Sequence, residues 1–158
     1  MSLQEQEYQK FWRGFIAYMK EHYPLYTQRS PSKNNRQIVP PDWFGGYVRI
    51  AAGINRPKEN VMQVDVTLNN RRSKRLTKEW YRRLRAEKEG VEREMGREEG
   101  ARWDWKERSE EPESHIIYSK YAPPEEKHWG EQYAWLAEKV DRFHEIFEPR
   151  IEALPSAL

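Results

Sequence analysis

The fold of this chain is decided by one run of alternating residues, Val61-Met62-Gln63-Val64-Asp65-Val66-Thr67-Leu68. Alternation with a period of two is typical of a β-strand with one buried and one wetter face, as in an antiparallel sheet. The run from Gly46 to Ile54 alternates in the same way. Between the two, residues 55–60 carry the turn formers Asn and Pro. The two runs are therefore expected to pair as a hairpin.

Segments with helical periodicity surround this hairpin. Residues 4–23 place apolar side chains three and four apart: Tyr8, Phe11, Trp12, Phe15, Ile16 and Met19. Residues 73–95 carry a second stripe, with Ser73 or Thr77 as a candidate cap and Gly96 as a stop, formed by Leu76, Trp80, Leu84, Val91 and Met95. The strongest stripe follows Pro123 and consists of Trp129, Tyr133, Leu136, Val140, Phe143 and Phe147. Three helices are therefore predicted.

Two further strands are expected at 102–106 and 115–121, with a short edge strand at 37–39. The element order α-β-β-α-β-β-α predicts an α+β fold in which an antiparallel or mixed sheet of about four to five strands packs with three helices. At 158 residues, the chain fits a single domain over residues 4–154.

Composition excludes several classes of protein. The chain has no cysteine, so disulfides, thiolate nucleophiles and Cys-ligated zinc are ruled out. Its mean hydropathy is −1.13 and no apolar run is long enough to span a membrane. Aromatic residues make up 13%, which argues against disorder. Since no secretion signal is evident, we expect a cytoplasmic protein.

The charges are unevenly distributed along the chain. Residues 71–88 hold nine basic and two acidic side chains, whereas residues 89–113 hold five basic and ten acidic ones. A basic helix and its entry turn suit neutralisation of phosphates, which binds the nucleic-acid backbone without reading sequence. The candidate nucleic-acid-binding residues are Arg71, Arg72, Lys74, Arg75, Lys78, Arg82 and Arg85.

Two other interpretations of this cluster stay open. The cluster can be a solvated helix face neutralised by the acidic segment that follows it, or it can bind an acidic protein partner. The polar loop 27–42 leaves a similar choice. Its basic residues lie near aromatic ones, which either stack single-stranded bases or close the core; these are Tyr23, Tyr26, Trp43, Phe44 and Tyr47.

Signals for catalysis are weak. Asp42 and Asp65 could hold a metal ion as in restriction-type nucleases, but Thr67 stands where those enzymes need a lysine. The four histidines are scattered: His128 and His144 are not at ligand spacing, and His22 and His115 show no acidic partner nearby in sequence. We therefore assign no catalytic residue, no metal ligand and no cofactor, and favour a non-catalytic role.

From about Tyr8 to Leu154 the chain resembles an uncharacterised prokaryotic domain-of-unknown-function family (four-two-six-eight). The resemblance is carried by Phe11-Trp12, by the strand 62–68, by Trp103-Asp104-Trp105, and by the ending from Trp129 through Phe147-Glu148-Pro149-Arg150-Ile151. It implies association with restriction- or nuclease-like domains, to which relatives are often fused, and it transfers no catalytic residues.

The favoured function is therefore a non-catalytic accessory module that binds DNA or RNA, possible partners being a nuclease or another protein. The alternative is a protein-interaction domain whose basic helix binds an acidic partner. A degenerate metal-dependent nuclease comes third.

Overall fold

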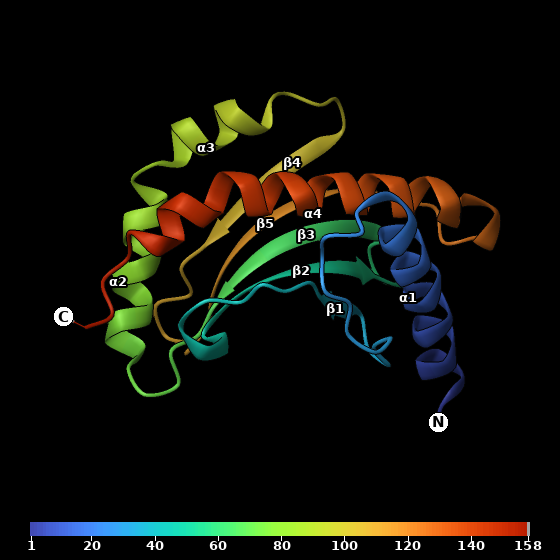
Figure 1. Ribbon diagram of the computed structural model, residues 1–158, viewed down its shortest axis with the longest axis horizontal. Coiled ribbons are helices and arrows are strands. Elements are labelled where there is room, and N and C mark those ends of the chain that lie inside the picture. Colours follow the sequence, from blue (N-terminus) through green and yellow to red (C-terminus); the bar gives the residue numbers. More distant parts are fainter. Residues whose placement is uncertain (158) are drawn as a thin grey trace.

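One antiparallel sheet organises the structure, a computed structural model that describes residues 1–157 (Figure 1). The strands lie in the order β1-β2-β3-β5-β4 and every neighbouring pair is antiparallel. Their bounds are β1 Arg36–Ile38, β2 Val48–Asn55, β3 Val61–Leu68, β4 Ala101–Lys106 and β5 Ser114–Tyr121. The predicted α+β class, the hairpin and the short edge strand are confirmed.

The sheet has an inner face that forms the core. Ile50 pairs with Val66 and Ala52 with Val64 across the hairpin, and all four side chains are fully buried. The 24-residue helix α4 (Trp129–Glu152) crosses this face of the sheet (Figure 1). Its predicted stripe is buried, with Leu136, Val140, Phe143 and Phe147 at 0% exposure. Burial of this apolar surface is the main source of stability.

The other helices lie at the two ends of the sheet. Helix α1 (Leu3–His22) packs on α4, with the ring of Phe11 5.2 Å from that of Trp129. Ser2 and Glu5 cap its start reciprocally. Helix α2 (Lys74–Arg85) lies at the opposite end of the sheet (Figure 1), where Ser73 caps it as predicted. Two single turns, η1 (Phe44–Gly46) and η2 (Glu126–His128), complete the elements.

The segment 73–95 is two helices and not the single helix expected. Helix α2 ends at Arg85 and α3 (Lys88–Met95) begins after Glu87, whose backbone is not helical. Helix α2 contacts β3 and β5, whereas α3 contacts α4. A straight helix could not pack against both surfaces. Glu87 at the break pairs with Arg150 of α4 at 3.0 Å, which holds the bend.

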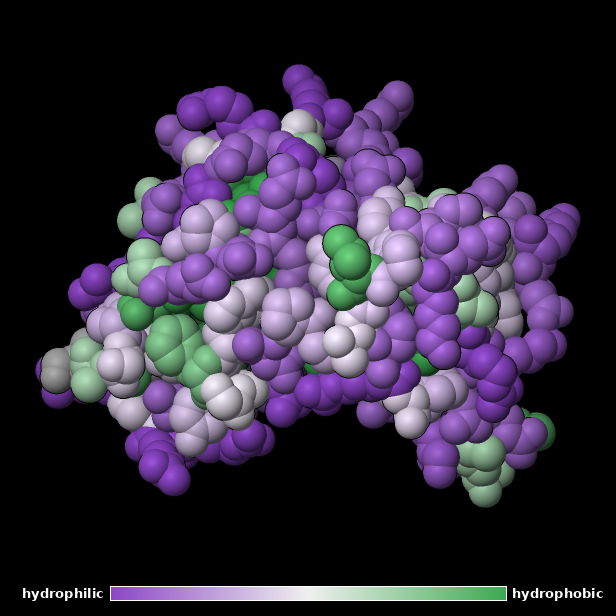
Figure 2. Space-filling model, viewed as in Figure 1, coloured by the Kyte–Doolittle hydropathy of each residue, from purple (hydrophilic) through white to green (hydrophobic). Residues whose placement is uncertain are grey.

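No helix covers the other face of the sheet within residues 1–157 (Figure 1), and we call this the open face. The space-filling view shows the molecule hollowed on this side, between the ends formed by α1 and α2 (Figure 2). Its side chains, given by the strand register, are Arg36, Ile38, Arg49, Ala51, Gly53, Asn55, Val61, Gln63, Asp65, Thr67, Arg102, Asp104, Lys106, His115, Ile117, Ser119 and Tyr121. None of the helices in residues 1–157 has the length and apolar character of a membrane span.

A buried histidine ties α4 to the loop before η1. His144 is 3% exposed, and its Nε2–H donates to the carbonyl of Val39 at 3.0 Å. Burial lowers its pKa from 6.5 to about 4, although the Val39 carbonyl, Asp141 and Asp42 favour the charged form. The folded protein therefore holds this imidazole neutral at pH values where the unfolded chain already protonates it.

Stability is expected to fall as the pH drops from about 6.5 to 4, because the unfolded state binds this proton first; the loss is on the order of 3 kcal/mol. Urea unfolding of wild type and His144→Gln, compared between pH 7 and pH 4, isolates the contribution, since the amide still donates to Val39. We expect the variant to lose less stability on acidification. Equal losses in the two proteins would contradict this assignment.

Candidate functional site

Most of the basic residues singled out in the sequence are exposed. The turn before α2 and its first helical turn present Arg71, Arg72, Lys74 and Arg75, and the helix presents Arg82 and Arg85 further along. The apolar side of α2 faces the core through Leu76, Trp80 and Leu84, which turns these cations to solvent. We call these six residues the basic surface.

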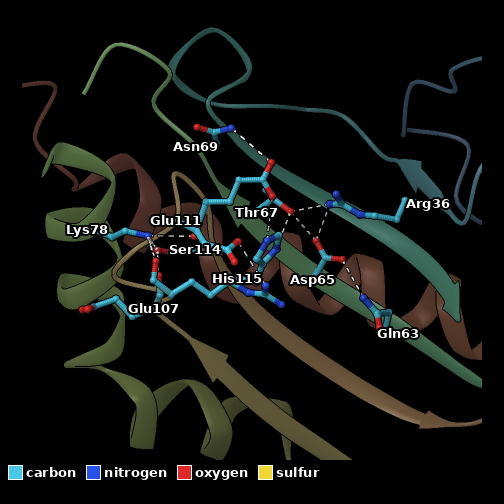
Figure 3. A network of polar contacts seen from close by, with 12 residues as sticks. Arg36, Gln63, Asp65, Thr67, Asn69, Lys78, Glu107, Glu111, Ser114 and His115 are labelled. Atoms are coloured by element: carbon cyan, nitrogen blue, oxygen red, sulfur yellow. Dashed lines mark hydrogen bonds and ion pairs between the residues drawn. The ribbon is translucent and has the colours of Figure 1, made fainter. Parts of the chain in front are cut away.

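Lys78 departs from that expectation because it is only 5% exposed. Its Nζ lies 2.8 Å from the carbonyl oxygens of Glu107 and Arg108, 3.0 Å from that of Glu113, and 2.9 Å from Ser114 Oγ (Figure 3). Burial lowers the pKa of this ammonium, while Glu107 opposes the change. Lys78 therefore fastens the β4–β5 loop to α2 and offers nothing to a phosphate.

The acidic segment does not neutralise the basic surface. Its carboxylates pair with other elements: Glu92 with Lys88, Glu94 with Arg150, Glu111 with Arg108, and Glu113 with His115. Glu107 alone of this segment reaches the basic surface, at Arg82. Within residues 1–157, Arg71, Arg72, Lys74, Arg75 and Arg85 form no ion pair. Direct ion pairs from the acidic segment are therefore missing for most of the cluster within residues 1–157.

Glu98 illustrates where these negative charges go. Its two oxygens bind Lys139 of α4 and Lys120 of β5 at 2.9 and 2.8 Å, and Trp135 Nε1–H donates to it at 2.8 Å. Burial opposes the charged carboxylate, but these three bonds outweigh it and lower the pKa of Glu98 to about 2. The segment before β4 is thus held against α4 and β5, away from α2.

The basic surface continues onto the open face. The guanidinium of Arg71 lies 5.6 Å from the centre of the Tyr47 ring, a cation–π contact. Tyr47 leads into β2, where Arg49 lies across from Thr67 of β3. Arg71, Tyr47 and Arg49 therefore lie between the entry of α2 and the adjoining end of β2 and β3.

A polar network occupies the open face (Figure 3). Arg36 of β1 donates through Nη2 to Asp65 Oδ1 at 2.8 Å and to Thr67 Oγ1 at 2.6 Å on β3. Its side chain crosses β2 at Ala51 and Gly53, where only a methyl group and a hydrogen atom stand on this face and leave room for it. Asp65 is 1% exposed, so Arg36 provides the charge that a buried carboxylate requires.

His115 joins this network from β5. Its Nδ1 lies 3.4 Å from Thr67 Oγ1, and its Nε2 lies 3.0 Å from Glu113 Oε2. Burial lowers the pKa of His115, against the influence of Asp65 and Glu113. The Thr67 hydroxyl, the His115 imidazole and the Glu113 carboxylate thus form a chain of contacts. However, Thr67 is only 8% exposed, and its oxygen already contacts Arg36 and Asp65. The arrangement presents no nucleophile to a substrate.

Sequence reasoning missed this network, although one signal was available. Glu113 stands two residues before His115, and that spacing places both side chains on one face of an extended segment. The partners of Asp65 come from β1, β3 and β5, and only the strand register brings them together.

The two aspartates considered for a nuclease are each paired with arginine. Asp42 contacts Arg29 at 2.9 Å and Arg49 at 3.9 Å, and Asp65 contacts Arg36. Within residues 1–157, no three His, Asp or Glu residues form a group suited to hold a metal ion. The loop aromatics Tyr23, Tyr26, Trp43, Phe44 and Tyr47 pack against the core, which favours their structural interpretation.

Comparison with known proteins gives a family without an assigned activity. The family model described as “Domain of unknown function (DUF4268)” matches residues 7–151, nearly the whole chain. No curated protein and no solved structure matches this chain.

Proposed function

We propose a function for this chain, which belongs to the family described as a domain of unknown function (DUF4268): it is a non-catalytic module that binds the phosphate backbone of nucleic acid. The observation that carries the proposal is a set of exposed cations that form no ion pair within residues 1–157: Arg71, Arg72, Lys74 and Arg75 at the entry of α2, and Arg85 at its end. Guanidinium and ammonium groups without protein partners are available to phosphate oxygens.

The shape of the molecule supports the same function. Arg71 contacts Tyr47 next to β2, and Arg49 of β2 lies on the open face, where Asp42 offsets part of its charge at 3.9 Å. A strand lying along α2 would therefore meet further cations on the sheet. We extend the proposal to a cytoplasmic accessory module that works beside a restriction- or nuclease-like protein, the association that the family resemblance implies.

Salt dependence tests this proposal. If the basic surface neutralises about four to six phosphates, the plot of log affinity against log salt on duplex DNA should have a slope of about −3.5 to −5.5. Affinity should depend little on base sequence, because backbone contacts carry no sequence information. Fluorescence anisotropy with labelled duplex and single-stranded oligonucleotides measures both.

The same titration separates the alternative function. An acidic protein partner would use the same cations, and the domain would then fail to hold any oligonucleotide even at about 50 mM salt, where backbone contacts are strong. That outcome would overturn the nucleic-acid proposal.

A further inference from the structure

The open face contains a hollow of about 220 Å³ next to the Asp65 network. All five strands contribute to its lining, which includes Arg36, Asn55, Gln63, Asp65, Lys106 and Ile117. None of these side chains belongs to the basic surface. The hollow is therefore a separate place in which a ligand group can be held.

The polar groups of the hollow are rich in unused acceptors. Asp65 Oδ1 accepts from Arg36 and Thr67, but Oδ2 accepts only a long bond of 3.3 Å from Gln63 Nε2. A carboxylate oxygen can accept more than one hydrogen bond. The amide oxygens of Gln63 and Asn55 accept no hydrogen bond from residues 1–157. A ligand group with two N–H bonds, such as an amino group on a ring, would satisfy these acceptors.

The remaining walls suit a flat ring. Ile117 offers an apolar surface, and the guanidinium of Arg36 offers a planar cation on which an aromatic ring can stack. Lys106 and Arg108 also line the hollow, so the surroundings repel a free ammonium compound and attract groups attached to phosphates.

We propose that this hollow takes one unpaired nucleobase bearing an exocyclic amino group, from a single strand whose phosphates lie on the basic surface. The inference rests on the proposed function and adds to it a preference for single strands, since a paired base in a duplex cannot leave its stack without cost. Amino-bearing bases bind here because the partly exposed amide oxygens of Gln63 and Asn55 accept their N–H groups, with the buried Asp65 carboxylate behind Gln63.

Oligo-dC and oligo-dU of roughly 12 nucleotides test the proposal, a length within the site sizes of single-strand binders. The two bases carry an amino group and a carbonyl at the same ring position. Wild type should bind oligo-dC about tenfold more tightly, the discrimination of one good base contact. The preference should disappear in Ile117→Trp, which fills the hollow, and in Gln63→Met, which removes the amide while keeping the side-chain length.

Ile38→Trp is the matched control, because Ile38 lies on the open face but does not line the hollow. It should keep the preference. Equal affinity of wild type for the two oligonucleotides, with the salt dependence intact, would overturn this inference and leave the proposed function standing. A preference that survives in both Ile117→Trp and Gln63→Met would also overturn it.

Free cytidine monophosphate distinguishes a strand from a mononucleotide. It should compete only at concentrations far above those of oligo-dC, because it lacks the neighbouring phosphates. Competition at equal concentration would overturn the strand proposal in favour of a free-nucleotide site. If the wild-type protein bound no oligonucleotide at low salt, both the proposed function and this inference would be overturned.

Discussion

Replacing Lys78 with methionine is expected to destabilise the fold by about 3–5 kcal/mol, the range for removing one member of a buried charged contact. Methionine keeps the length of the side chain but removes the ammonium donor that Glu107, Arg108 and Glu113 share. Ser114 Oγ still donates to the Glu107 carbonyl and the Glu111 N–H to the Arg108 carbonyl, so the loss is greatest at Glu113 and Ser114 Oγ. Those oxygens lie where the β4–β5 loop meets α2, so water replaces the ammonium poorly. Such a loss is a large part of the stability of a domain of this size.

Urea unfolding followed by tryptophan fluorescence measures the effect, with Lys74→Met as the matched control. Lys74 lies one turn earlier on the same helix and is exposed, so its replacement should change stability by no more than about 0.5 kcal/mol. If Lys78 were a solvent-facing phosphate contact, the two variants would be equally stable, and that result would contradict its buried role.

Lys78 shows what periodicity can and cannot predict. The strand 61–68 and the stripes of α1 and α4 were predictable because each element buries a face that repeats in its own sequence. Lys78 lies on the polar side of the α2 stripe, and only the β4–β5 loop folding over it makes it buried. The break between α2 and α3 has the same origin, because it depends on which partner each half meets.

The candidate site divides in the same way. The basic surface was predictable as a local concentration of charge, apart from Lys78. The network around Asp65 was not, because Arg36 and His115 are distant from it in sequence and reach it through strand register. Whether the acidic segment neutralises the cations was also undecidable from sequence, since it depends on where each carboxylate finds a partner.

Reversing two charges at the entry of α2, with Arg72→Glu and Arg75→Glu together, is expected to weaken nucleic-acid binding on the order of 100-fold, or about 3 kcal/mol. Both side chains are exposed and form no ion pair within residues 1–157, so the change removes two phosphate contacts and introduces two repulsive charges. Stability should stay close to wild type, because neither residue touches the core. Anisotropy titration at low salt measures the loss.

The control is a second double variant that changes the net charge by the same amount but lies away from the basic surface. Arg13 of α1 and Lys127 of η2 are exposed at the end of the molecule opposite α2 (Figure 1), and replacing both with glutamate should weaken binding only slightly. An equal loss in the two double variants would mean that binding follows net charge and not the basic surface.

A second pair of substitutions tests which residues of the basic surface contribute most to nucleic-acid binding. Arg82 and Arg85 share a face of α2, but Arg82 already pairs with Glu107 at 2.9 Å. A phosphate must displace that carboxylate or share its arginine, so Arg82 contributes less to binding than an unpaired neighbour. Arg82→Glu with Arg85→Glu should therefore weaken binding less than the Arg72 and Arg75 pair. The opposite order would place the nucleic acid along the last turn of α2, where Glu107 would have to release Arg82 for each strand bound.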